Sequence, residues 1–440
     1  MPPRFIGTRI RAAPHNGARR FGERFWHKRK YEKCGNTGCI SNFSYCTIGA
    51  KDPPKPAAPI VRCCLKLKTS FFSARFSSVN YKTSSGHTTK ETKSKEGESM
   101  AKNKRGRSSF LLSSQPVITA WASVAGKKEG QGPLAHTFDI TSQDPYFGQK
   151  TWEQAEKVMQ QTALNTLLKK TALKEEDLDL VFSGDLLNQC IGSSFSLRNT
   201  GIPHLGLYGA CSTMAESLLA ASMAVDGGYA DRVAALTSSH FASSERQYRF
   251  PLGYGGQRTP TAQWTVTGSG AALVCSQGKG PVITACTIGT VTDLGIKDAN
   301  NMGAAMAPAA FDTIRRHFED LGVGPEEYDL IVTGDLGQLG KELLLELARK
   351  DGLSLGGKLA DCGTLVFDNT TQDVHAGGSG CGCSAITLCG YLLGELKKGK
   401  MKKLLFCGTG ALLSPTSTQQ GLPIPGVCHA VAIAQSDERQ

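Results

Sequence analysis

Apolar residues recur at three- and four-residue spacing after Thr151, and this spacing predicts a helix. The residues of its apolar face are Trp152, Ala155, Met159, Ala163 and Leu167. Thr151 and Gln154 match a capping box, which favours a helix start at this point. The continuous apolar run 178–182 then predicts a short buried strand that is closed by Asp185.

This pattern has a counterpart 150 residues later. The segment 176–186 (EDLDLVFSGDL) matches 326–336 (EEYDLIVTGDL). A second pair of matching segments follows. In each half a turn with glycine and cysteine opens a helix, and the helix leads to a strand, at 232–239 in the first half and at 403–410 in the second. The repeat predicts an α/β fold of two similar halves with a parallel-rich sheet covered by helices. We expect the halves at 101–280 and 281–440.

Residues 1–100 differ from the rest in charge. They hold 20 Lys and Arg against 6 Asp and Glu, whereas residues 101–440 hold 30 against 32. The positive excess therefore lies outside the α/β region, which offers no basic surface for nucleic acid. The first hundred residues show no sustained helical or strand period. We expect a disordered or spurious extension, dispensable for folding, with Met100 as the true start; a functional arm is the alternative.

The distribution of cysteine and of apolar residues argues against a disulfide-rich protein and a membrane-spanning protein. Ten cysteines are scattered through residues 101–440, and such cysteines act as small buried hydrophobes more often than as disulfides. No apolar run approaches the ~18 to 20 residues that span a bilayer. The oxygen-rich segment 293–301 does not follow the EF-hand spacing, so we expect no metal site and no cofactor.

A series of longer motifs resembles the stage V sporulation protein AD family, whose fold is similar to that of thiolases and ketoacyl synthases. The motifs occur in order at 130–136, 184–189, 208–213, 237–240, 245–251, 254–257, 302–309, 376–384 and 408–415. The similarity extends from about Pro116 to the C-terminus. It implies an α/β, thiolase-like fold in which two similar halves pack as a layered sandwich.

The resemblance also implies a function. It implies a soluble subunit of a spore membrane complex that moves dipicolinic acid, with calcium, into the forespore and out at germination. The location would be peripheral on the spore inner membrane, through other membrane subunits, and a homodimer is possible. Two alternatives remain, namely an active condensing acyltransferase that uses Cys211 and a purely structural subunit with an empty pocket.

Cys211 occupies a turn that runs directly into a helix. A helix N-terminus stabilises a thiolate, and the resemblance places the nucleophile of condensing enzymes here; a buried structural cysteine is the alternative. Acyl transfer also needs histidine or asparagine partners. No histidine follows the strand that ends at 332–336, Ser379 lies near one partner's place, and His375 lies upstream of the glycine turn. We expect a vestigial nucleophile position and no catalysis.

A second polar cluster follows the strand 232–239. It contains His240, Arg246 and Arg249, and the arginines present a planar fork suited to carboxylates. Ion pairs with Glu245 or Asp231 are an equal alternative, and a lone histidine is more often structural. We expect the ligand-binding residues to be Cys211, His240, Arg246, Arg249 and Ser379.

Two aspartates occupy equivalent places in the halves. Asp185 and Asp335 each follow a predicted strand, at the same point of the repeat. The duplication favours a shared structural role, such as capping the next turn, over a paired acid and base. The glycine-rich segment 377–382 either brings amides close to an anion or allows tight packing.

Overall fold

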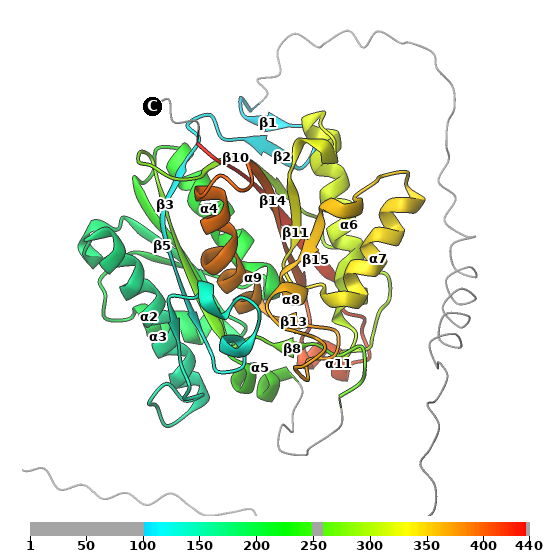
Figure 1. Ribbon diagram of the computed structural model, residues 1–440, viewed down its shortest axis with the longest axis horizontal. Helices are drawn as coiled ribbons and strands as arrows, with labels where there is room; N and C mark the ends of the chain where they lie inside the picture. Colours follow the sequence, from blue (N-terminus) through cyan, green and yellow to red (C-terminus); the bar gives the residue numbers. More distant parts are fainter. Residues whose placement is uncertain (1–100, 249–257, 437–440) are drawn as a thin grey trace, which may run out of the picture. The chain divides into compact units, whose positions relative to one another are not determined.

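The computed structural model describes residues 101–248 and 258–436, which belong to one compact unit, Ser94–Gln440 (Figure 1). The expectations for residues 1–100 lie outside the described residues. The strands of the first half are β3 (Val117–Ala125), β5 (Leu180–Gly184), β6 (His204–Leu207), β7 (Arg232–Ser239) and β9 (Gly268–Cys275). Those of the second are β10 (Val282–Ile288), β11 (Leu330–Thr333), β12 (Leu359–Asp361), β14 (Lys403–Ala411) and β15 (Gly426–Ala434).

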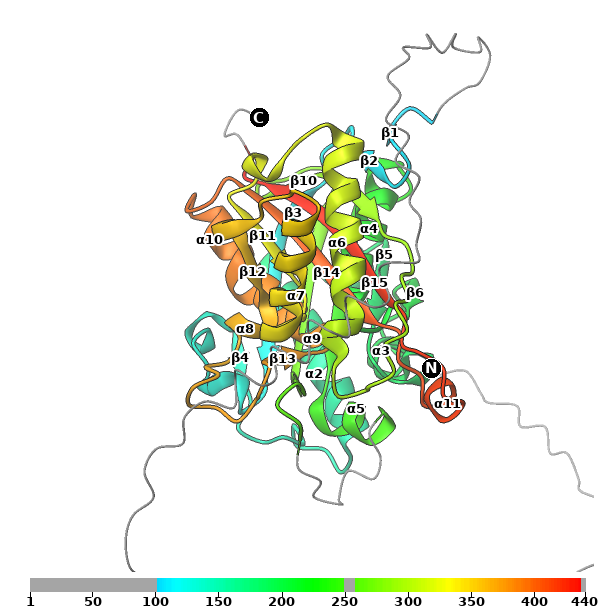
Figure 2. The same cartoon turned by 90° about the vertical axis from the view of Figure 1, so that its right-hand side faces the viewer.

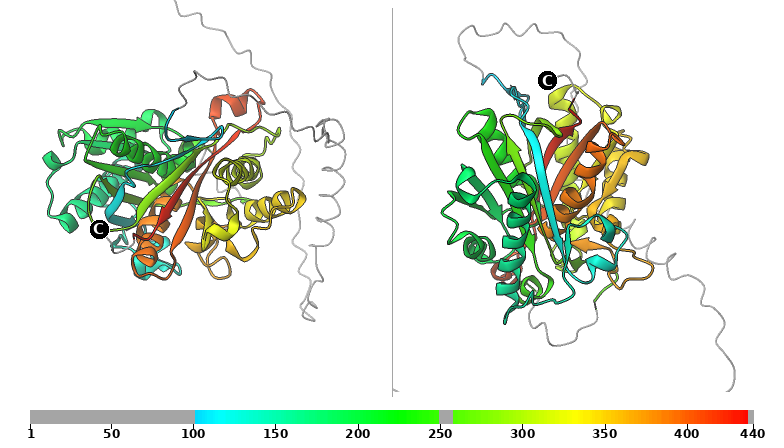
Figure 3. Two further views of the ribbon diagram at one scale, coloured as in Figure 1. Left: turned by 90° about the horizontal axis from the view of Figure 1, so that it is seen from above. Right: turned by 60° about the vertical axis from the view of Figure 1, so that its left-hand side comes forward.

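The strand order repeats from one half to the other. It runs β6-β5-β7-β9-β3 in the first half and β12-β11-β14-β15-β10 in the second, and β3 meets β10 where the halves join. Figure 3 shows the two halves side by side from above. The prediction of two similar αβ halves is therefore confirmed at the level of topology. We propose that the boundary lies in the turn between β9 and β10.

The prediction of a parallel-rich sheet holds only for the outer strands. In each half the outer three strands pair in parallel, but the inner pairs β7-β9, β9-β3, β14-β15 and β15-β10 are antiparallel. Parallel neighbours need a crossover helix, whereas antiparallel neighbours need only a return connection. The chain returns from β14 to β15 through the short helix α11 (Pro415–Gln419), so this pair is antiparallel.

Two long outer helices repeat in detail. The helices α2 (Trp152–Thr171) and α6 (Met302–Leu321) have 20 residues each. The Thr151 side chain accepts the Gln154 amide at the start of α2, and the Asn301 side chain accepts the Ala304 amide at the start of α6. The predicted N-terminal cap of α2 is thus confirmed. Figure 2 shows α6 on the outer face of the second half.

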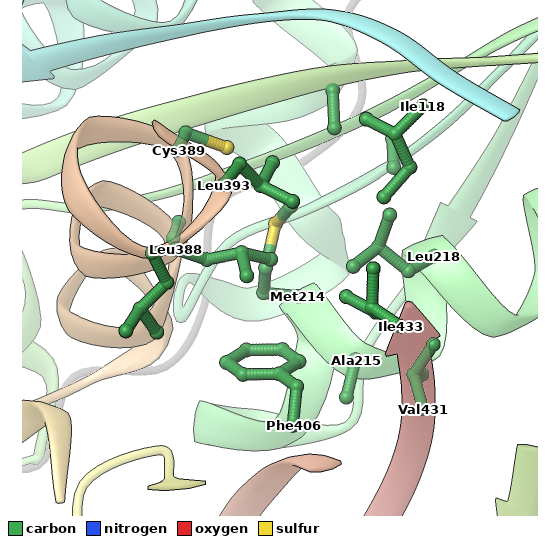
Figure 4. Packing of buried hydrophobic residues seen from close by; sticks show 14 of the residues in the cluster. Ile118, Met214, Ala215, Leu218, Leu388, Cys389, Leu393, Phe406, Val431 and Ile433 are labelled. Carbon is green, nitrogen blue, oxygen red and sulfur yellow. The ribbon is translucent and has the colours of Figure 1, made fainter. Parts of the chain in front are cut away.

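The inner helices lie between the two groups of strands. The helix α4 (Thr213–Asp226) contacts β5 and β7 of its own half and β14 and β15 of the other. Its counterpart runs through α9 (Cys381–Thr387), a π-helical segment (Leu388–Leu392) and α10 (Leu393–Lys397). Figure 4 shows Met214 of α4 beside Leu388 and Phe406. Most of α4 is buried, and a largely buried helix favours small and apolar residues on several faces, which explains its alanine-rich sequence.

Alternation along the strands produces the layers. Val233 and Ala235 of β7 belong to the inner core with α4, whereas Ala234 and Leu236 belong to the outer core with α2. Successive side chains of a strand point to opposite faces, and both faces are covered by helices. This explains why the strands read as continuous apolar runs.

The other elements connect these layers. They are β1 (Lys104–Arg105), β2 (Ser109–Leu111), β4 (Ile140–Thr141), α3 (Ile191–Leu197), α5 (Phe241–Tyr248), β8 (Trp264–Thr265), α7 (Gly337–Lys350), α8 (Cys362–Leu365), β13 (Gly378–Ser379) and several single 3-10 turns. Among the residues that the structure describes, none of the helices is both long and apolar enough to cross a membrane.

Candidate functional site

A small cavity lies where the two halves meet, beside the start of α4. Its volume is about 40 Å³. The lining comes from both halves and comprises Leu186, Ala210, Cys211, Ser244, Glu245, Tyr248, Thr265, Met302, Ser379, Ala411 and Leu413. β14 ends at Ala411, and α4 begins just after Cys211. Ligands of α/β proteins gather where strand ends and helix starts converge in this way.

Cys211 lies at the base of this cavity. Ala210 adopts a left-handed conformation (φ 53°), and the turn Ala210–Ser212 leads directly into α4, as predicted. The thiol is buried and forms a hydrogen bond with the Asp335 carboxyl group. Burial, and then the negative charge of Asp335, raise the pKa of the Cys211 thiol well above its ordinary value. At Cys211 burial therefore outweighs the helix dipole and the nearby amides, which would favour a thiolate.

Asp335 is the central polar group of the site. Its carboxylate accepts the Thr409 hydroxyl at 2.7 Å and the Gly380 amide at 2.8 Å. Burial raises the pKa of Asp335 to about 7, although these hydrogen bonds oppose the shift. Near neutral pH the carboxyl group is consequently present in both protonation states, and the protonated form can donate a hydrogen bond.

One wall of the cavity is formed by α5. The Thr265 hydroxyl donates to the Glu245 carboxylate at 3.0 Å, and the Tyr248 hydroxyl donates to the Leu186 carbonyl at 2.5 Å. The Ser244 hydroxyl is buried and has no hydrogen-bond partner among the residues that the structure describes. Buried polar groups are normally paired. The Ser244 hydroxyl in the lining therefore marks a place where a ligand or water would be bound.

The structure separates the residues that we predicted as ligand-binding. Cys211 and Ser379 line the cavity. His240 directly follows β7, as expected, but is buried outside the cavity lining, with Nε2 at 2.8 Å from the Pro145 carbonyl. Its Nδ1 has no partner within the described part of the chain. Burial lowers the pKa of His240, which favours the neutral ring.

Arg246 lies away from the cavity. It forms an ion pair with Glu153 and lies over the Trp152 ring, 5.2 Å from its centroid. The alternative of a structural ion pair thus describes its position, with Glu153 in place of the partners that we considered. Arg249 lies outside the described residues.

Histidine is missing from the described lining of the cavity. His375 lies instead beside Asp373, with Nε2 at 3.1 Å from the carboxylate. Residues 101–248 and 258–436 also contain no group of three or more His, Cys, Asp or Glu side chains arranged to hold a metal. The described groups at the cavity are a protonated thiol, carboxyl groups, hydroxyls and backbone amides, which suit hydrogen bonding.

Sequence reasoning did not place Asp335, Ser244 or Tyr248 at the site. We expected Asp335 to cap the next turn, but that turn is held by Asp361, which accepts the amides of Leu336 and Gly337. One signal was available, because Asp335 closely follows β11, which pairs with β14. Ser244 and Tyr248 of α5 were not singled out from the sequence, whereas Glu245 and Arg246 of the same helix were.

Comparisons with known proteins agree with the motifs. Residues 106–434 match the family model described as Stage V sporulation protein AD (SpoVAD). Stage V sporulation protein AD of Bacillus subtilis (strain 168) is 44% identical over 332 residues, which cover 75% of this chain and 98% of that protein.

The solved structures that this chain resembles are much more distant in sequence. The 3-oxoacyl-[acyl-carrier-protein] synthase III of Aquifex aeolicus is 15% identical, covering 72% of this chain and 99% of that one, with a TM-score of 0.44. The corresponding synthase of Xanthomonas oryzae is also 15% identical, covering 74% and 100%, with a TM-score of 0.48. The family match covers most of the chain, and we conclude that this protein belongs to the stage V sporulation protein AD family.

Proposed function

We propose that this sporulation protein binds dipicolinic acid in the Cys211 cavity. In that role it would serve as the ligand-binding subunit of a spore membrane complex that moves dipicolinate, with calcium, into the forespore and out at germination. One observation carries the proposal: the carboxyl group of Asp335, which can be protonated near neutral pH, lies beside a thiol that is held protonated. This arrangement preserves an enzyme-like cavity while favouring binding over covalent chemistry.

Hydrogen-bond donors at the cavity support a carboxylate ligand. The Ser244 hydroxyl lines the cavity and can donate to a carboxylate oxygen. Asp335 acts indirectly, because it is not part of the described lining and holds the Cys211 thiol and the Gly380 amide. Each hydrogen bond to a charged group contributes roughly 1.5 to 3 kcal/mol. Calcium, where it accompanies dipicolinate, would enter as part of the cargo and would reduce the charge that has to be desolvated.

The size of the cavity adds a requirement. A volume of about 40 Å³ holds a few waters, whereas pockets for small molecules typically enclose about 300–1,000 Å³. Dipicolinate can therefore enter only if the wall moves. We expect α5, which carries Ser244, Glu245 and Tyr248, to shift outward when the ligand binds.

Calorimetry of the full chain with dipicolinate tests this proposal. Ser244→Leu places apolar bulk in the cavity and should abolish the binding heat. Arg246→Ala alters a residue outside the cavity and should leave it unchanged. Isophthalate, which lacks only the ring nitrogen, shows whether that nitrogen is recognised. Unchanged dipicolinate binding by folded Ser244→Leu would place the ligand elsewhere.

The competing proposal is a condensing acyltransferase that uses Cys211. We infer that it is disfavoured, because the high pKa of the thiol leaves little thiolate and the described lining offers no histidine as a base. Incubation with acyl-CoA followed by mass spectrometry discriminates between the proposals. Stoichiometric acylation of Cys211 with turnover to a second substrate would establish the enzyme.

We further propose that the protein acts with membrane subunits on the spore inner membrane and as a homodimer. The edge strand β6 supports the dimer, because Leu205 is 55% exposed and Tyr208 is 48% exposed at one end of the sheet. An exposed apolar edge strand readily pairs with a second copy. Leu205→Lys should convert a dimer into a monomer by light scattering; a wild-type monomer would contradict this part of the proposal.

A further inference from the structure

A turn rich in lysine precedes β14. Five of the seven residues between positions 397 and 403 are lysines, and the segment contains no carboxylate. Lys397, Lys398, Lys400 and Lys402 are exposed, and Lys403 is partly exposed. So many like charges within one turn repel each other unless carboxylates or a bound anion neutralise them.

Nearby carboxylates offset only part of this charge. Glu395 accepts both Lys398 Nζ at 3.0 Å and Lys400 Nζ at 2.8 Å. Lys403 forms an ion pair with Glu327.

The other two lysines have different surroundings. Asp329 accepts the backbone amides of Lys402 and Lys403. Lys397 lies over the Trp121 ring, 5.6 Å from its centroid. Even when Asp329 is counted with Glu395 and Glu327, five lysines face three carboxylates in the described surroundings, and the turn keeps a positive excess.

A surface cavity opens beside the same turn. Its volume is about 560 Å³, which is within the usual range for small-molecule sites. It is lined by Leu134, His136, Thr137, Gly390, Tyr391, Gly394, Glu395, Lys398 and Lys400. The single carboxylate of this lining, Glu395, is already bridged by both lysines. A ligand in this cavity would therefore meet the ammonium groups of Lys398 and Lys400 and the imidazole of His136.

The wall of this cavity has an unusual backbone. Gly390 and Tyr391 belong to the π-helical segment between α9 and α10 (Figure 2). Such segments are rare and occur frequently at functional sites. In the first half, the corresponding helix α4 is described as a continuous α-helix. The irregular helix thus coincides with the cavity and the lysine turn.

We propose that this cavity and the turn 397–403 bind the phosphate headgroup of an anionic phospholipid. A phosphate suits the ammonium groups, and the lysines beyond the cavity suit a surface of many phosphates better than one free anion. β14 runs from Lys403 to Ala411, which lines the Cys211 cavity. At about 3.3 Å per residue, the two sites lie roughly 26 Å apart along the strand.

Hydrogen exchange of the full chain tests this site locally. Residues 1–100 carry 20 Lys and Arg and would bind anionic vesicles themselves, so the readout is the protection of amides 388–403. Vesicles of equal parts phosphatidylglycerol and phosphatidylcholine should protect this segment, and pure phosphatidylcholine should not. Lys398→Gln/Lys400→Gln should raise the half-saturating lipid concentration roughly 30-fold, which corresponds to about 1 kcal/mol per lysine.

A matched variant removes the same charge elsewhere. Lys174→Gln/Lys350→Gln alters two lysines that also pair with glutamates, Glu176 and Glu346, and it should behave like the parent. Equal loss in both variants would overturn the proposal, as would protection by phosphatidylcholine alone or no protection at all. Equal protection by free glycerol phosphate would assign the cavity to a metabolite and also overturn the membrane claim.

Discussion

The two halves of this protein place an aspartate at the same point and use it differently. In the first half, Asp185 accepts the Leu187 amide and both the amide and hydroxyl of Ser193, so it holds its own turn. In the second half, Asp361 accepts the amides of the equivalent turn. Asp335 does not accept these amides and forms a hydrogen bond with Cys211 instead. Duplication of a fold therefore allows one copy to keep the structural role while the other contributes to a site.

The largest predicted effect is on the free energy of unfolding when either aspartate is replaced by alanine. Asp185→Ala should lower the free energy of unfolding by about 3 to 5 kcal/mol, because it leaves three buried donors without an acceptor. Asp335→Ala should cost roughly 1 to 3 kcal/mol, since water in the adjacent cavity can reach the groups left behind. Urea unfolding measures both values. A larger loss for Asp335→Ala would mean that Asp335 is the structural residue.

The pH dependence of the unfolding free energy should also report on Asp335. The folded pKa of Asp335 is about 7, above its unfolded value of about 3.9. The stabilisation from the protonated form is complete below pH ~4 and is lost as pH rises toward 7. Burial also raises the pKa of Glu129 to about 7 and of Glu156 to about 8, so they add to this slope.

Replacing Asp335 should flatten that slope. Asp335→Asn removes one titrating group, which is worth up to about 1.4 kcal/mol per pH unit within the window. Urea unfolding at pH 5, 6 and 7 gives the slope for the parent and the variant. Parallel curves for the two proteins would show that Asp335 is not protonated on folding.

A pair of serines gives a smaller effect. Ser193 donates to Asp185 at 2.7 Å, whereas the Ser244 hydroxyl has no partner in residues 101–248 and 258–436. Ser193→Ala should cost about 1 to 2 kcal/mol. Ser244→Ala should leave the melting temperature unchanged or slightly raise it, and weaken dipicolinate binding. Thermal unfolding distinguishes the two, and a clear loss of stability in Ser244→Ala would reveal a partner for its hydroxyl.

The smallest effect belongs to Arg246. Its ion pair with Glu153 is partly exposed, and such pairs contribute about 0 to 1 kcal/mol. Arg246→Ala should change stability by less than about 1 kcal/mol and leave dipicolinate affinity unchanged. A ten-fold loss of affinity would restore the direct contact with a carboxylate that the sequence suggested.

Periodicity and duplication predicted most of the fold. The strand 232–239 and the starts of α2 and α4 agree with the structure, because buried faces impose strict spacing on the chain. The antiparallel pairs were missed, since local periodicity does not specify which strands become neighbours. The family motifs identified the sporulation family, and the comparisons confirm it.

The candidate site was less accessible from sequence. Cys211 and Ser379 both line the cavity, since each belongs to a motif at the end of a regular element, and their role in ligand binding stays a prediction. Asp335 was expected to cap the next turn as its repeat partner Asp185 does, whereas it accepts the Gly380 amide before α9 and the Thr409 hydroxyl instead. Arg246 was predicted to bind a ligand because its guanidinium group suits carboxylates. The direction of its side chain depends on how α5 packs against α2, and no local sequence pattern encodes that packing.

The most direct test of this account is calorimetry of dipicolinate binding to the two aspartate variants. Asp335→Ala removes the carboxyl group beside Cys211, whereas Asp185→Asn alters the equivalent residue while keeping its shape. The account predicts that folded Asp335→Ala loses roughly ten-fold or more in affinity, about 1.4 kcal/mol, and that Asp185→Asn binds like the parent. Parent-like binding by Asp335→Ala, or an equal loss in Asp185→Asn, would contradict it.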